Sequence, residues 1–213
     1  MSFQNFKSTS LLLTLLGIAA FVSPAFAEDP SAKANDTKTQ ALPPGMDEAM
    51  MAKMKEYGTP NENHQLLQKL VGDWDYTMKW WMAPDGPADE STGTNVIKSI
   101  LGGRFIEQNV SGTSNGQPFE GRGTMGFDNS KKEYNFVWID NMGTGMMLSN
   151  AAYDPATKTF SEKGSFSCPL KGETSFRGKT KIIDDDTFTY EMYMNDKDGK
   201  EFKSMEVDYK RKK

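Results

Sequence analysis

The stretch "LVGDWDYTMKWWM", from Leu70 to Met82, places three of the chain's four tryptophans shortly after Gly72. A chain that leaves a helix and enters the first strand of a β-barrel has to pass close to another backbone at the closed end. Glycine permits that approach and the unusual dihedral angles that it needs. Trp74, two residues later, offers a large apolar surface that can plug the closed end. The stretch therefore fits the first strand of a barrel, and the barrel itself is predicted from the pattern that follows.

The pattern after Trp74 extends this prediction to the rest of the chain. Turn signals recur about every ten residues, at "APDGPADES", "LGG", "SNGQP", "DNSKK", "NMGTG", "DPATK", "CPLKG", "DDD" and "NDKDGK". The segments between them alternate or are rich in β-branched and aromatic residues. Such spacing predicts an antiparallel meander of about ten strands, with no room for the crossover helices of a parallel sheet. Because a twisted sheet of this size closes or splits, we predict an all-β, up-and-down barrel, with a β-sandwich as the alternative.

The N-terminal region is predicted to hold a signal peptide over residues 1–27 and a flexible linker over residues 28–45. Lys7 precedes a continuous apolar run from Leu11 to Val22, and "SPAFA" supplies a cleavage signal after it. The run is too short to span a bilayer. We therefore predict export to the periplasm or to the outside of the cell. The mature chain is expected to begin at Glu28 and to contain no membrane span.

Residues 46–71 are predicted to form one or two short helices ahead of a barrel domain over residues 72–213. "MDEAMMAKMKEYG" spaces methionines at helical intervals. In "TPNENHQLLQKLVG", Thr59 fits an N-cap and Glu62 completes a capping box. The chain has 14 methionines, whose thioethers could bind Cu(I). We expect them instead to form an adaptable apolar face that closes the barrel.

Longer stretches of the chain resemble known families. Gly72 and Trp74, with Arg211 at the end of the last predicted strand, are similar to the signature of the calycin barrels, which include the lipocalins. "HQLLQKLVGDW", "ILGGRFIEQNVSG", "PFEGRGTMGFDNSKKEYNFVWIDNMGTG" and "AAYDPATKTF" together resemble a bacterial family known as domain of unknown function 1579. The resemblance runs from Met46 to Arg211 and implies an exported, lipocalin-like barrel. It gives Gly72, Trp74 and Arg211 structural roles and implies no reaction.

One predicted strand carries the residues that we expect to bind a ligand. Period-two alternation places three aromatic rings and a carboxylate on one face: Tyr134, Phe136, Trp138 and Asp140. If that face lines the lumen, Asp140 needs a partner, and Arg122 and Arg104 are the candidates. Alternatively, Asp140 caps the turn that follows the strand. The sequence leaves both alternatives open.

Several kinds of site are excluded by composition. His64 is the only histidine, which removes Ser-His-Asp, Cys-His and His-rich zinc arrangements. It lies before the first strand, so we expect it to pack at the base of the barrel rather than to bind haem. No catalytic residue, metal site or cofactor is predicted. The net charge of −4, without a basic stripe, argues against nucleic-acid binding.

Three functions are consistent with the sequence. The first is an exported barrel that binds a small, largely apolar ligand in its lumen. The second is a barrel enzyme, of the isomerase or hydrolase type, that uses Asp140 with Arg122 or Tyr134. The third is a solid-core structural or interaction protein of the cell envelope. We favour the first because barrels of this type often bind ligands, and the sequence predicts no oligomeric state.

Overall fold

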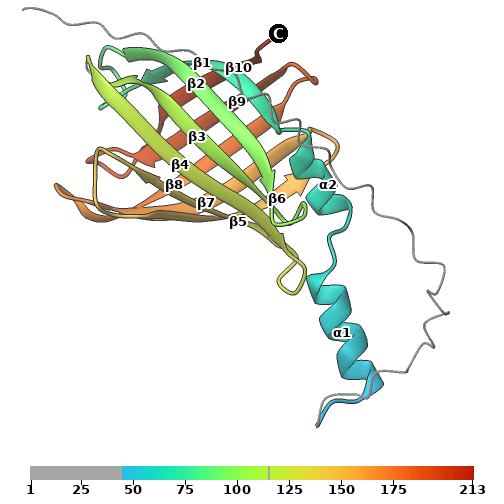
Figure 1. Cartoon of the computed structure of the whole chain (residues 1–213). Helices are drawn as coiled ribbons and strands as arrows, with labels where there is room; N and C mark the ends of the chain where they lie inside the picture. The colour runs from blue at the N-terminus through green and yellow to red at the C-terminus, as the bar shows by residue number, and fades with distance from the viewer. Residues whose placement is uncertain (1–44, 115) are drawn as a thin grey trace, which may run out of the picture. The chain divides into compact units, whose positions relative to one another are not determined.

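Residues 45–114 and 116–213 are described by a computed structural model, which shows a closed barrel of ten antiparallel strands (Figure 1). Each strand pairs with the next along the chain, and β1 pairs with β10 to close the barrel. The predicted up-and-down barrel is therefore confirmed. The predicted signal peptide lies outside the described residues. The strands are β1 (Gly72–Trp80), β2 (Asp89–Ile100), β3 (Phe105–Ser114), β4 (Gln117–Asp128), β5 (Glu133–Asp140), β6 (Met147–Asp154), β7 (Thr159–Cys168), β8 (Gly172–Ile182), β9 (Thr187–Asn195) and β10 (Glu201–Arg211).

Side chains alternate across each strand because successive Cβ atoms point to opposite faces. In β1, Trp74 and Tyr76 are buried inside the barrel, whereas Asp75 between them is exposed outside. Trp81 follows the end of β1, and the Nζ of Lys203 lies 6.0 Å from the centroid of its ring. The alternation seen in the sequence therefore sets which residues can reach the lumen.

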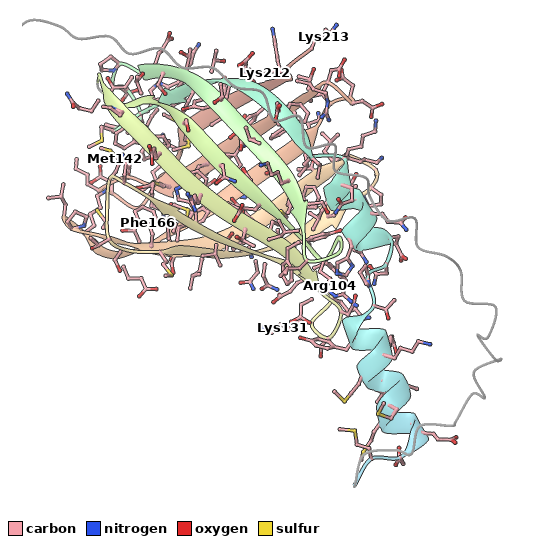
Figure 2. The ribbon with its side chains drawn as sticks, viewed as in Figure 1. Arg104, Lys131, Met142, Phe166, Lys212 and Lys213 are labelled. Atoms are coloured by element: carbon pink, nitrogen blue, oxygen red, sulfur yellow. The ribbon has the colours of Figure 1, made fainter. Side chains whose placement is uncertain are left out.

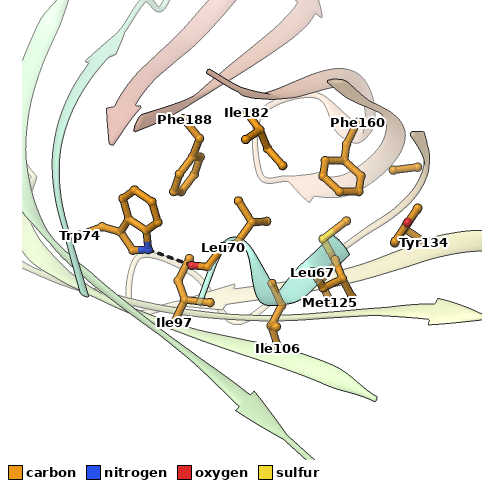
Figure 3. Close-up of a cluster of buried hydrophobic side chains, with 11 residues drawn as sticks. Leu67, Leu70, Trp74, Ile97, Ile106, Met125, Tyr134, Phe160, Ile182 and Phe188 are labelled. Carbon is orange, nitrogen blue, oxygen red and sulfur yellow. Dashed lines mark hydrogen bonds between the residues drawn. The ribbon is translucent and has the colours of Figure 1, made fainter. Parts of the chain in front are cut away.

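The closed end of the barrel is filled by α2 (Glu62–Gln68) and by the turn that leads into β1. Leu67 is fully buried, and the Nε1 of Trp74 donates a hydrogen bond of 2.9 Å to the carbonyl oxygen of Leu70 (Figure 3). Fully burying a leucine side chain such as that of Leu67 stabilises the fold by about 1.5–3 kcal/mol. The strand residues packed around these three are Ile97, Ile106, Met125, Tyr134, Ala151, Phe160, Ile182 and Phe188.

The start of α2 differs from the prediction. Its N-cap is Asn61 and not Thr59, so the prediction on this point is wrong. The Asn61 side chain accepts a hydrogen bond of 3.0 Å from the backbone N–H of Asn63. His64 completes the capping box, because its Nδ1 accepts the Asn61 N–H over 3.1 Å. Asparagine caps a helix at least as well as threonine, so the helix begins at the better cap.

The first helix, α1 (Glu48–Gly58), buries none of its residues. Met50 and Met54 are 50% and 58% exposed, so the prediction that this apolar face closes the barrel is wrong. The leucines of α2 close it instead. The C-terminal end of α1 is hydrogen-bonded to the barrel: the Nδ2 of Asn129 donates to the carbonyl oxygen of Tyr57 over 2.9 Å. None of the helices in the described ranges is both long and apolar enough to cross a bilayer.

Candidate functional site

The inside of the barrel is tightly packed at the α2 end and less evenly packed beyond it. Beyond the packed end, five inward-facing side chains are buried, Tyr76, Val110, Phe176, Met192 and Val207. Others are only half-buried, although strands surround them: Met78, Phe119, Phe136, Trp138, Glu162, Phe166, Tyr190 and Met205. A side chain that points into a closed barrel and still has accessible surface borders space that water can enter. In Figure 2 this end of the barrel carries the labels of Met142 and Phe166, and the opposite end carries those of Arg104 and Lys131.

Two glycines in β4 make room for the aromatic rings of β5. A Cβ added to Gly121 would lie 2.3 Å from Cζ2 of Trp138, and one added to Gly123 would lie 2.7 Å from Cε2 of Phe136. Cβ atoms do not approach other atoms so closely, so any larger residue would push the rings away. The two rings therefore lie against the backbone of β4 and line one wall of the interior.

Asp140, the last residue of β5, uses both carboxylate oxygens close to its own strand. Its Oδ2 accepts a hydrogen bond of 2.8 Å from the Nε1 of Trp138. Its Oδ1 accepts one of 2.9 Å from the backbone N–H of Met142. Asp140 therefore caps the turn after β5, as one of the two alternatives predicted, and it also fixes the orientation of the Trp138 indole.

The arginines proposed as partners of Asp140 lie elsewhere. Arg122 is in register with Ile139 and points out of the barrel, so the Asp140–Arg122 pair, the other of the two alternatives, is not formed. Arg104 is exposed in the turn before β3, where its Nη2 donates to the carbonyl oxygen of Gly58 over 2.8 Å. That contact holds the end of α1. The structure therefore places neither arginine at the wall formed by β5.

Tyr134 faces inward, but it lies at the packed end and not beside Asp140. It is 1% exposed, and its hydroxyl donates to the Oδ1 of Asn63 in α2 over 3.1 Å. Burial raises the pKa of Tyr134 to about 12, so the hydroxyl remains protonated at neutral pH. Of the five predicted ligand-binding residues, the structure brings only Trp138 and Asp140 into contact.

A second inward-facing carboxylate, that of Glu162 in β7, was missed by the sequence analysis. Its Oε1 accepts a hydrogen bond of 2.7 Å from the hydroxyl of Tyr190 in β9, and its Oε2 accepts one of 3.0 Å from the Oγ of Ser149 in β6. Gly178 of β8 lies between β7 and β9, and a Cβ there would be 2.1 Å from the Oε1 of Glu162. This glycine therefore allows Glu162 to reach across β8 to Tyr190.

The surroundings of Glu162 are neutral. Burial raises the pKa of its carboxyl, and the hydrogen bonds from Tyr190 and Ser149 partly offset that shift. Burial raises the pKa of Tyr190 well above its ordinary value, and the negative charge of Glu162 raises it further. The Tyr190 hydroxyl therefore stays protonated and remains a donor. No salt bridge to Glu162 forms within the part of the chain that the structure describes. One signal was present in the sequence: alternation in "TFSEKGSF" puts Glu162 on the same face as Phe160 and Phe166.

The three residues expected to be structural meet at the closed end. The guanidinium carbon of Arg211 lies 4.1 Å from the centroid of the Trp74 ring. Its Nη1 donates to the carbonyl oxygen of Val71 over 2.8 Å, and its Nη2 donates to that of Lys69 over 3.1 Å. Gly72, the residue after Val71, has a positive φ of 143°. These contacts fasten the end of β10 to the junction between α2 and β1.

His64 also lies in the packed base. It is 5% exposed, and its ring packs edge-on against Phe127 with the centroids 5.9 Å apart. Desolvation lowers the pKa of His64, so the imidazole is neutral at neutral pH. Within residues 45–114 and 116–213, no three His, Cys, Asp or Glu side chains lie close enough together to hold a metal ion.

Comparisons with known proteins identify a family and a fold. The family model described as "Protein of unknown function (DUF1579)" matches residues 59–211. No curated protein matches the chain. The chain is similar to the crystal structure of Rv2717c from M. tuberculosis, with a TM-score of 0.55 at 14% identity, over 73% of this chain and 100% of that one. At that identity the likeness shows the barrel fold alone.

A redesigned β-barrel, mFAP1 bound to DFHBI, is also similar to this chain. It is 18% identical over 71% of this chain and 100% of that one, with a TM-score of 0.37. That value is too low to carry an argument about this protein.

Proposed function

This chain belongs to the DUF1579 family of proteins of unknown function, and we propose that it binds a small, largely apolar ligand inside the barrel. The site is the half of the interior away from α2. The observation that carries the proposal is the water-accessible wall formed by Phe136 and Trp138, with the Trp138 indole held by Asp140.

The composition of this wall supports an apolar ligand. Pockets for small molecules are lined mainly by hydrophobic and aromatic side chains, with a few polar groups that orient the ligand. The half-buried inward residues are mostly aromatic rings and methionines, and Asp140 and Glu162 supply carboxylates. The hydrogen bond from Trp138 to Asp140 orders the indole before a ligand arrives, which reduces the entropy lost on binding.

The packing of the barrel supports a site with one entrance. The α2 end is filled by the buried leucines and by Trp74, so we place the entrance at the other end. Gly121 and Gly123 keep the rings of β5 against the wall and out of the middle of the lumen. Beyond the packed end Tyr76, Val110 and Val207 are buried, whereas Trp138 and Phe119 keep part of their surface exposed, so we place the ligand beside these two rings.

The proposal is tested with 1-aminoanthracene, a neutral aromatic probe whose fluorescence rises in apolar surroundings. We expect saturable binding that 1-octanol displaces. Trp138→Ala removes part of the proposed wall and should weaken binding about tenfold, the effect of losing about 1.4 kcal/mol of contact.

Val137→Ala is the matched control, because Val137 is the adjacent residue and faces outward with 37% of its surface exposed. It should leave the affinity for 1-aminoanthracene unchanged. Absence of saturable binding, or equal affinities for the Trp138→Ala and Val137→Ala variants, would contradict the proposed site.

We also propose that the protein acts outside the cytoplasm. The basic start, apolar run and small-residue cleavage signal of residues 1–27 support this location. N-terminal sequencing of the exported protein should begin at Glu28, and a mature chain that retains Lys7 would contradict the proposal.

A further inference from the structure

We propose that the polar group of the ligand is a protonated amine that binds Glu162, so that the barrel selects apolar amines over apolar acids. This inference rests on the proposed function and adds the chemical class of the ligand. It depends on three features of the interior: the sign of its charges, the free hydrogen-bonding capacity of Glu162, and the rigid placement of that side chain.

The charges that face the lumen are mainly negative. Among the inward-facing positions of the ten strands, the acidic residues are Asp89, Asp140 and Glu162, and the basic one is Arg211. Arg211 lies at the packed end, where its guanidinium is held by backbone carbonyl oxygens. Like charges repel more strongly where water is partly excluded, so a carboxylate ligand is disfavoured and a cation is attracted.

Glu162 has capacity for further hydrogen bonds. A carboxylate offers about four acceptor positions, and Tyr190 and Ser149 each occupy one. The remaining positions can accept N–H donors from a ligand. An ammonium group carries three such donors and no acceptor, so it matches the free positions and also neutralises the carboxylate.

The position of Glu162 is fixed before a ligand binds. Its two hydrogen bonds come from strands on either side of β7, and the missing side chain of Gly178 lets the carboxylate lie across β8. Among the described residues no Lys or Arg forms a salt bridge with Glu162, so its carboxylate has no cationic partner there. A bound ammonium group would supply that partner, next to the Tyr190 hydroxyl that donates to the same carboxylate.

The inference is tested by isothermal titration calorimetry with three probes of equal chain length: octylamine, octanoate and 1-octanol. At neutral pH we expect octylamine to bind at least about tenfold more tightly than octanoate. Glu162→Gln keeps the size of the side chain and an oxygen that can accept from Tyr190. It should weaken octylamine binding about tenfold and leave 1-octanol within about twofold.

Glu90→Gln is the matched control, because Glu90 lies in β2 on the outer surface and pairs there with Lys79. It removes the same charge from the protein but not from the lumen, so it should leave all three affinities unchanged. Ser149→Ala serves as a second variant, since it removes one of the two bonds that hold the carboxylate. It should weaken octylamine binding more than 1-octanol binding.

Each outcome distinguishes the two proposals. Equal affinities of the unmodified protein for octylamine and octanoate would overturn the amine preference, whether or not any variant folds. Binding of 1-octanol in that experiment would leave the proposed apolar site intact. Absence of binding for 1-octanol and 1-aminoanthracene alike would overturn both proposals.

Discussion

The Nη1 of Arg211 occupies the place where a side chain on Gly72 would begin. A Cβ built on Gly72 would lie 2.1 Å from that nitrogen, and the φ of Gly72 is 143°. The same nitrogen donates to the carbonyl oxygen of Val71. A glycine at the start of β1 therefore lets an arginine from the last strand reach the turn that leaves α2, and this contact links the last strand to the base of the barrel.

Gly72→Ala should destabilise the protein by about 1–3 kcal/mol, because alanine is strained at this φ and its Cβ displaces Arg211. Urea unfolding measures the change. Gly143→Ala is the control, since Gly143 has no positive φ and its nearest neighbour, the backbone nitrogen of Gly145, would be 4.0 Å from the new Cβ. Equal stabilities of the two variants would contradict the role assigned to Gly72.

Arg211→Ala should lower the melting temperature and leave the affinity for 1-aminoanthracene unchanged. The cation–π contact with Trp74 contributes about 0.5–2 kcal/mol, and hydrogen bonds from the guanidinium to the Val71 and Lys69 carbonyl oxygens are lost with it. Thermal unfolding and probe titration measure the two effects separately. A large loss of affinity at normal stability would instead place Arg211 in the ligand site.

Asp140→Ala should cost about 1 kcal/mol, as expected for the loss of a turn cap, and not the several kcal/mol that follow from breaking a buried ion pair. Asp140 bonds to Trp138 and to the backbone of Met142, while Arg122 points outward. A double-mutant cycle with Arg122→Ala should therefore be additive. A coupling energy above about 1 kcal/mol would show that the two residues interact.

Glu162→Gln should stabilise the protein at neutral pH. Burial raises the folded-state pKa of the Glu162 carboxyl above its ordinary value of 4.5. At pH values between 4.5 and the raised pKa, the folded protein binds more protons than the unfolded chain. The stability of the unmodified protein therefore falls as the pH rises through this range. The hydroxyls that face the carboxyl, those of Tyr190 and Ser149, do not titrate there.

The measurement is urea unfolding of the Glu162→Gln variant and the unmodified protein over a range of pH. The stability advantage of the variant should shrink as the pH is lowered towards 4.5. His64 is present in both proteins, so its titration cancels in the difference. A difference that does not depend on pH would contradict the raised pKa.

Met54→Ala in α1 should leave the free energy of unfolding nearly unchanged, because Met54 is 58% exposed. Leu67→Ala in α2 removes a fully buried side chain and should cost about 2–5 kcal/mol. Chemical denaturation of the two variants compares the helices directly. Similar losses would show that α1 packs against the barrel in solution.

Local sequence patterns determined the strands and their inward faces. The positions of the turns and the alternation between them predicted the barrel, and they placed Trp138 and Asp140 on one side of β5. This succeeded because side chains alternate with a period of two along any strand, whatever the strand pairs with. The same alternation did not predict that Tyr134 lies at the packed end, because that depends on which end α2 fills.

Only the tertiary structure decided the contacts between strands. Glu162 meets Tyr190, which is 28 residues away in the chain, across a glycine in the strand between them. Arg122 faces away from Asp140 because the register of β4 against β5 puts it opposite Ile139. Register and barrel closure are set by long-range pairing, which a pattern of period two does not specify. The sequence therefore determined which residues can face the lumen, and the closed barrel decided which of them meet.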